Sequence, residues 1–93
     1  MNDFPDDALP RLARGCRLST TKGHEDTLLI PEGALRLKGP ARAVIELCDG
    51  KRNFGDIVRE LQRRYPSEDS ARIESDVASL LERLRDKRVI DVE

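Results

Sequence analysis

Residues 27–48, TLLIPEGALRLKGPARAVIELC, contain the change of periodicity that decides the fold. Residues 27–30 are a short apolar run, and apolar and charged side chains alternate over residues 34–38, as in strands with one buried face. Residues 31–33, Pro-Glu-Gly, suit a short hairpin turn because Pro fixes φ and Gly tolerates positive φ. The period lengthens to 3.6 residues after Pro40, which favours a first helical turn. The stretch predicts a hairpin followed directly by a helix.

The flanking sequence adds one strand and two helices. Residues 16–20 alternate with period two, which predicts a strand before the hairpin. Downstream, Asn53 can cap a second helix with Asp56 as its capping-box partner, and Pro66 ends that helix. A third and longest helix is predicted over residues 67–88. The pattern predicts an α+β, winged-helix-like domain of three antiparallel β-strands followed by three α-helices.

The two ends of the chain fall outside this pattern. Residues 1–10 contain three Asp and two Pro with few apolar side chains, which predicts a mobile N-terminal arm and a single domain over residues 11–93. Residues 89–92 return to period two, typical of a short terminal strand or of a segment packed beside the helix end. The N-terminus is acidic where a signal peptide is basic and then apolar, so a cytoplasmic protein is expected.

Composition limits the classes of function. The chain has 93 residues with 38% hydrophobic and 38% charged side chains, which is enough for one small aliphatic core. Its formal charge of -1 disfavours binding to nucleic acid, and no apolar run is long enough for a membrane span. Two separated Cys and one His support neither a zinc site nor a disulfide framework. With no catalytic motif, we expect a protein that is not an enzyme and has no cofactor or metal.

The order of three strands and three helices makes a winged-helix DNA-binding regulator the first alternative. The third predicted helix argues against it, because Glu68 and Asp69 place negative charge at the end where a recognition helix needs bases. A purely structural adaptor is another alternative. These alternatives stay open beside a peptide-binding module.

Residues 34–38 are the candidate edge strand. An open edge can bind an extended peptide through its backbone, and a neighbouring groove then provides specificity. In the competing interpretation, Leu35 and Leu37 only fill the core while Arg36 and Lys38 protect the edge from pairing. The residues alone do not decide between the two. The same edge can also pair with a second copy of the chain, so a homodimer is a further hypothesis.

Three short pieces of the sequence are specific enough to compare with a known family. They are Ile30-Pro31-Glu32-Gly33, the helix end Asp49-Gly50, and Asp76-Val77. With further matches over about residues 9–92, they resemble the PqqD family of pyrroloquinoline quinone (PQQ) biosynthesis. The sequence departs from that family at residues 39–41, and at residues 87–89, where a Gly commonly closes the last helix.

The resemblance implies a peptide chaperone of the RiPP recognition element type, which is not itself catalytic. Such proteins bind the precursor peptide PqqA and present it to the radical SAM enzyme PqqE. In such proteins the peptide adds to the third strand and lies against the third helix. Arg36 or Arg83 can then pair with acidic residues of the peptide. For Val77 and Leu80, packing in the core is the alternative role. The implied peptide-binding residues are Ala34, Leu35, Arg36, Leu37, Lys38, Asp76, Val77, Leu80 and Arg83. Apart from the resemblance, the expected surface for the partner enzyme is the outer face of the second helix with Arg59, Arg63 and Arg64, and solvated charges are the alternative interpretation of these arginines.

Overall fold

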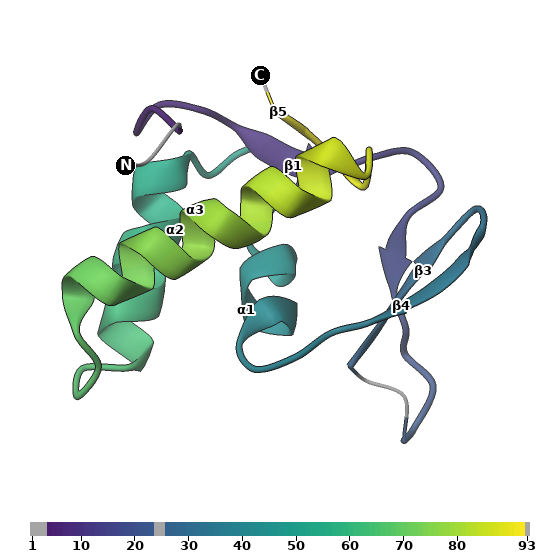
Figure 1. Cartoon of the computed structure of the whole chain (residues 1–93), viewed down its shortest axis with the longest axis horizontal. Coiled ribbons are helices and arrows are strands. Elements are labelled where there is room, and N and C mark those ends of the chain that lie inside the picture. Colours follow the sequence, from purple (N-terminus) through teal and green to yellow (C-terminus); the bar gives the residue numbers. More distant parts are fainter. Residues whose placement is uncertain (1–3, 24–25, 93) are drawn as a thin grey trace.

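Two small antiparallel sheets and three helices make up the structure, a computed structural model that describes residues 4–23 and 26–92 (Figure 1). Three helices follow a three-stranded sheet along the chain, so the predicted α+β class is confirmed. No helix in the described part of the chain is long and apolar enough to cross a membrane. In chain order the elements are β1 (Pro10–Leu12), β2 (Arg17–Leu18), β3 (Thr27–Ile30), β4 (Gly33–Arg36), α1 (Ala41–Glu46), α2 (Phe54–Arg64), α3 (Ser70–Asp86) and β5 (Ile90–Val92).

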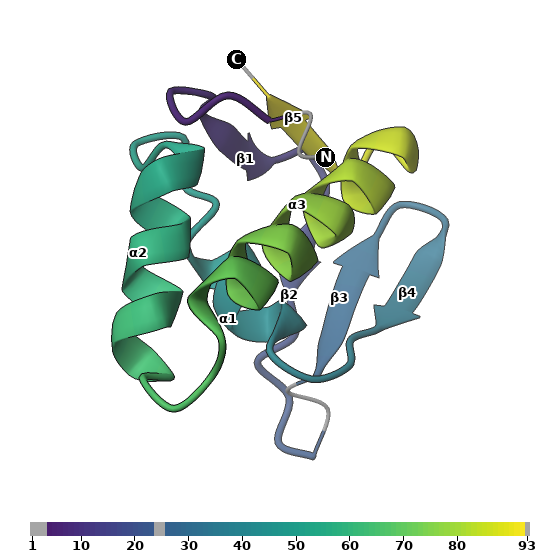
Figure 2. The same ribbon diagram turned by 60° about the vertical axis from the view of Figure 1, so that its left-hand side comes forward.

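The predicted hairpin is confirmed as the pair β3 and β4. Ile30 pairs with Gly33, which leaves a two-residue loop, and Gly33 has a φ of 148° that favours glycine. β2 pairs with the other side of β3, so the order is β2-β3-β4 and β4 is an edge strand (Figure 2). The first predicted strand was too long: only Arg17–Leu18 pairs, against the expected residues 16–20.

Helices α2 and α3 begin where side chains satisfy their first backbone N–H groups. The predicted capping box of α2 is confirmed, because the Asn53 side chain accepts from the Asp56 N–H at 2.8 Å and Asp56 accepts from the Asn53 N–H at 3.1 Å. In α3 the cap is Asp69, whose carboxylate accepts from the Ala71 N–H at 2.9 Å. The helix therefore begins at Ser70 and ends at Asp86, which is shorter than the predicted residues 67–88.

One apolar cluster joins the hairpin to all three helices. Figure 2 shows α3 crossing between α2 and the strands β3 and β4. The side chains at its centre come from different elements and are excluded from solvent, which is the dominant favourable term in folding. The most deeply buried apolar side chains of this cluster are Leu28, Val44, Ile45, Phe54, Ile57, Leu61, Leu81 and Ile90.

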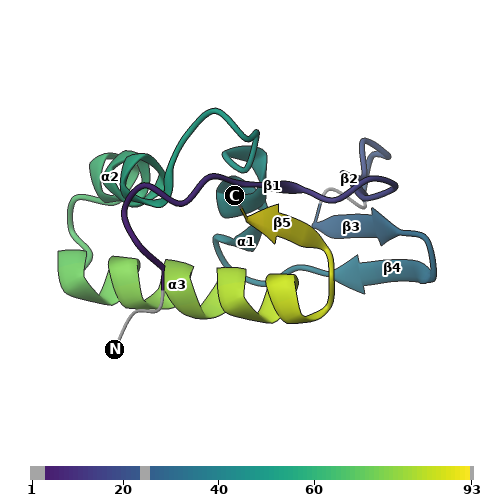
Figure 3. The same cartoon turned by 90° about the horizontal axis from the view of Figure 1, so that it is seen from above.

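The N-terminal segment is packed onto the domain. Phe4 and Ala8 are each only 4% exposed. The Ala8 carbonyl accepts a hydrogen bond from the N–H of Phe54, the first residue of α2, at 2.8 Å. β1 pairs with β5 in a separate two-stranded sheet, which lies alongside the C-terminal part of α3 (Figure 3). The core therefore extends beyond the expected boundary at residue 11, while residues 1–3 lie outside the described residues and the mobility of the segment stays a prediction.

The C-terminal end of α3 has a Schellman motif with an arginine in the usual glycine position. The Arg88 N–H donates to the Arg85 carbonyl at 2.9 Å, and the Val89 N–H donates to the Leu84 carbonyl at 2.8 Å. Arg88 consequently has a φ of 61°. In this left-handed region a side chain with a Cβ is strained, and the sharp turn directs residues 90–92 back towards β1.

The strain at Arg88 gives a test of this helix end. We expect Arg88→Gly to raise the free energy of unfolding by about 1 kcal/mol, because glycine adopts positive φ without the Cβ clash. Arg88→Ala keeps the strained Cβ and should bring no such gain. Urea denaturation of the two variants beside the parent chain measures the difference. An equal gain in both variants would mean that the arginine side chain, and not its backbone conformation, is responsible.

The packing of Phe4 gives a second test. Its ring stacks on Phe54 with centroids 5.7 Å apart, and the Arg85 guanidinium lies 5.1 Å from the Phe4 centroid. We expect Phe4→Ala to lower the free energy of unfolding by about 2–3 kcal/mol through lost burial and ring contacts. Phe4→Leu should lose less. Thermal unfolding checks this; an unchanged midpoint for Phe4→Ala would mean that the segment leaves the domain, as its composition predicts.

Candidate functional site

The free edge of β4 has unpaired backbone groups at defined positions. The Leu37 N–H donates to the Asp26 carbonyl at 2.6 Å, and antiparallel pairs alternate between bonded and non-bonded positions. In the observed register, Gly33 and Leu35 then direct their backbone groups towards β3. The N–H and C=O of Ala34 and Arg36 point away from the sheet. This spacing of two residues is what an added strand requires.

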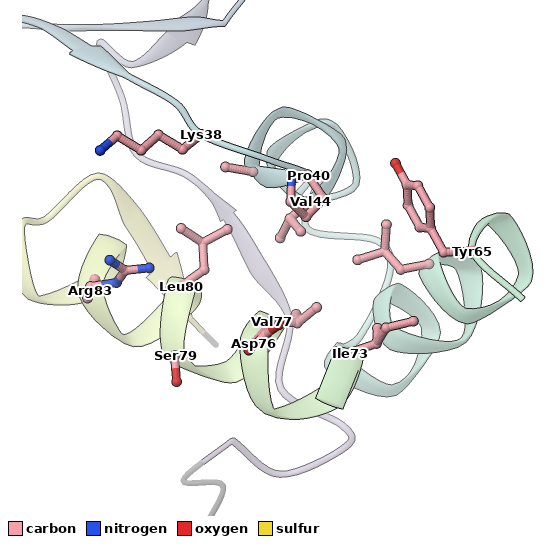
Figure 4. A pocket seen from close by; sticks show the side chains of 12 residues that line it. Lys38, Pro40, Val44, Tyr65, Ile73, Asp76, Val77, Ser79, Leu80 and Arg83 are labelled. Atoms are coloured by element: carbon pink, nitrogen blue, oxygen red, sulfur yellow. The ribbon is translucent and has the colours of Figure 1, made fainter. Parts of the chain in front are cut away.

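A groove lies beside the end of β4. It has a volume of about 260 Å³ and runs between the segment after β4, helix α1, the end of α2 and one face of α3 (Figure 4). Val77 is 3% exposed and lies at its floor, while Leu80 is partly exposed. The groove is therefore preformed by core side chains that continue to its surface.

The structure brings five of the nine predicted site residues together in this groove. The four others lie in β4 or immediately after it; among them, Leu37 is buried in the core and Arg36 is exposed. Arg36 does not line the groove. Of the two arginines predicted to pair with a peptide acid, only Arg83 is therefore placed to do so in the groove. The five lining residues are Lys38, Asp76, Val77, Leu80 and Arg83.

The sequence interpretation missed one wall and one end of the groove. Pro40 and Val44 form the wall facing α3, and Tyr65 and Ile73 lie at the end where α2 meets α3 (Figure 4). Tyr65 is 41% exposed, the one large apolar side chain among the described residues that is exposed to this degree. The available signal was its position directly before Pro66, at the helix end, where a large side chain can leave the core.

The exposed surface of α2 is cross-linked by its own ion pairs. Glu60 accepts hydrogen bonds from both Arg63 and Arg64, and these guanidinium groups lower the pKa of the Glu60 carboxyl to about 2. Arg59 is paired with Asp56, whose carboxyl pKa is lowered first by the Asn53 N–H and then by Arg59. The three arginines expected to contact an enzyme thus have local carboxylate partners, and whether they dock a protein stays a prediction.

Neither cysteine has the properties of a nucleophile. Burial raises the pKa of the Cys48 thiol to about 12, and its Sγ lies 3.3 Å from the Val44 carbonyl. Burial also raises the pKa of the half-buried Cys16 thiol. A reactive thiol needs a lowered pKa, so both side chains act in packing. Among residues 4–23 and 26–92, no three side chains of the types that ligate metals are grouped together.

Comparison with known proteins assigns the family. The model of the family "Coenzyme PQQ synthesis protein D (PqqD)" matches residues 27–90, which include β3, β4 and all three helices. The chain belongs to the PqqD family. This assignment makes the chain a non-catalytic recognition element of PQQ synthesis.

Two curated relatives and one solved structure agree with this assignment. The "PqqA binding protein" of Azotobacter vinelandii is 35% identical over 90% of each chain. That of Methylococcus capsulatus is 46% identical over 59% of this chain, and the match spans 56% of the relative. The solution structure of the PqqD truncation of Methylobacterium extorquens PqqCD, described as a stand-alone RiPP recognition element, has a TM-score of 0.77 and 35% identity, covering 97% of this chain and 96% of that one.

Proposed function

We propose that this PqqD-family chain binds a PqqA precursor peptide by strand addition to β4. The observation that carries the proposal is the pair of outward-facing backbone groups at Ala34 and Arg36 on an edge strand. A peptide strand bonds to such groups whatever its sequence, and side chains on alternate positions then enter a neighbouring groove. The names of the relatives, which are PqqA binding proteins, support PqqA as the peptide.

The groove beside α3 supplies the specificity in this proposal. Lys38 is the second residue after β4 and lines the groove, so a peptide paired with β4 continues into it. Val77 and Leu80 offer apolar surface there. The core role considered for these two side chains is compatible with binding, because a residue at the edge of the core contributes to both.

We further propose that the bound peptide is presented to the radical SAM enzyme PqqE, which modifies it. Strand addition leaves the rest of a peptide free on the outer side of β4, where an enzyme can reach it. A second copy of the chain would compete for the same edge. A homodimer paired through β4 is therefore the peptide-free form in this proposal, and sedimentation of the chain with and without peptide would detect it.

Proline substitution separates backbone pairing from side-chain recognition. Arg36→Pro removes the outward N–H of β4, and proline is tolerated on an edge strand where the N–H faces solvent. We expect PqqA to bind at least about tenfold more weakly, a loss of roughly 1.4 kcal/mol. Arg36→Ala, the matched control, keeps the N–H and should change the affinity by less than about threefold. Calorimetric titration measures the affinities, and circular dichroism confirms that each variant folds; parent-like binding by Arg36→Pro would exclude strand addition at this position.

Presentation is tested with the enzyme present. We expect the parent chain to accelerate the modification of PqqA by purified PqqE, as followed by mass spectrometry. Arg36→Pro should give no acceleration at low concentration and should recover it at high concentration, because only peptide binding is weakened. A failure to recover would assign β4 a direct contact with the enzyme. If PqqE modifies PqqA equally fast without the chain, presentation is wrong while peptide binding stands.

A further inference from the structure

The groove and the hollow that continues from it have opposite charges at their two ends. Lys38 and Arg83 lie together at the end nearest β4 (Figure 4). The other end, beside Tyr65, is lined by Glu68, Asp69 and Asp76 against a single base, Arg72. Lys38 and Arg83 give a formal charge of +2 at the first end, and three acids against one base give -2 at the second. Asp76 also lines the groove itself and lies where the groove and the hollow join. A chain with a net charge of -1 thus contains a strongly polarised binding surface.

The positive end is not neutralised within the protein. Both Lys38 and Arg83 are exposed, and neither makes a side-chain hydrogen bond or ion pair with any residue in the described ranges 4–23 and 26–92. The guanidinium of Arg83 and the ammonium of Lys38 come from opposite walls of the groove, one from α3 and one from the segment after β4. Two cations on facing walls favour a carboxylate between them.

The negative end is only weakly neutralised. Asp76 lies 3.8 Å from Arg72, and both side chains are largely exposed, 68% and 76% respectively, so this pair contributes little. Asp69 has a structural role as the cap of α3, which leaves Glu68 and Asp76 as the carboxylates available to a ligand. The exposed ring of Tyr65 borders the same hollow, and an aromatic face beside carboxylates favours a cationic side chain.

The surface between the two ends is apolar. Val44 comes from α1, and Val77 and Leu80 come from α3. A peptide side chain placed here loses contact with water and needs no polar partner. The order along the surface, from β4 to the junction of α2 and α3, is therefore positive, apolar and negative.

We propose that this polarised surface fixes the orientation of the bound peptide by its charge order. It selects a peptide segment in which an acidic and a basic residue flank an apolar one. The acidic residue lies between Lys38 and Arg83, and the basic residue lies beside Tyr65 and Asp76. In the reversed orientation both ends meet like charges, which suppresses that binding mode. This inference rests on the proposed function, because it concerns the same groove.

Charge reversal at the two ends gives the decisive comparison. With PqqA as the probe at low salt, we expect Arg83→Glu and Asp76→Lys each to weaken binding at least about tenfold, and 0.5 M NaCl to reduce both losses because salt screens exposed charges. The matched controls, Lys22→Glu and Glu74→Lys, make the same charge changes outside the groove lining and should alter the affinity less than about threefold. If net charge alone attracted the peptide, one groove variant would bind PqqA more weakly and the other more tightly than the parent chain. That result would overturn the proposal.

Compensating changes in the peptide identify the paired residues. Each acidic residue of PqqA is replaced in turn by Lys, and each basic residue by Glu. We expect one acid replacement to restore binding to Arg83→Glu, and one base replacement to restore binding to Asp76→Lys. Rescue by no replacement would overturn the charge order.

The outcomes also separate this proposal from the one on which it rests. If the parent chain binds PqqA and Arg36→Pro does not, while the charge variants bind like their controls, strand addition stands and the charge order is wrong. If the parent chain does not bind PqqA, both proposals are wrong. Circular dichroism of each variant shows that a loss of binding does not come from unfolding.

Discussion

The rest of the structure depends on the burial of one stripe of α3 between α2 and the hairpin. Val77, Leu81 and Leu84 on that stripe are at most 4% exposed and belong to the same apolar cluster as Leu28 of β3 and Phe54 of α2. Close packing on this side prevents α3 from moving without opening the core. The adjoining flank of the helix, with Asp76, Leu80 and Arg83, therefore presents the groove wall in a fixed position. A peptide meets a surface that needs little rearrangement, which lowers the cost of binding.

Contacts at the C-terminal end of α3 reinforce this position. The Schellman motif at Arg88 sends the chain back so that β5 pairs with β1, and Arg85 contacts the ring of Phe4. The N-terminal segment is thereby joined to the same helix that forms the groove wall. Its carbonyls also satisfy two N–H groups at the start of α2, those of Phe54 and Gly55. Stability at both helices is thus supplied by residues far away in the sequence.

Local signals in the sequence were sufficient to predict the hairpin, the capping box of α2 and the amphipathic helix α3, because each of them depends on neighbours within a few residues. The strand β5 agrees with the period-two pattern of residues 89–92, but its pairing with β1 was not predictable in this way, since the two three-residue strands lie about 80 positions apart. Composition likewise gave no sign that Phe4 stacks on Phe54. For the site, the family resemblance implied Asp76, Leu80 and Arg83, which line the groove from α3. The opposite wall, with Pro40 and Val44, required the tertiary packing of α1.

The backbone edge alone is too weak to account for specific binding. Ala34 and Arg36 offer at most two N–H and two C=O groups, and at about 0.5–1.5 kcal/mol for each net hydrogen bond the total is roughly 2–6 kcal/mol. Ordering a flexible peptide consumes much of that energy. One apolar side chain buried in the groove adds about 1.5–3 kcal/mol, and charged groups at its ends add discrimination more than affinity. In the proposed binding mode the short edge strand therefore needs the adjoining groove, and it is the two together that would let so small a domain hold one peptide in one orientation.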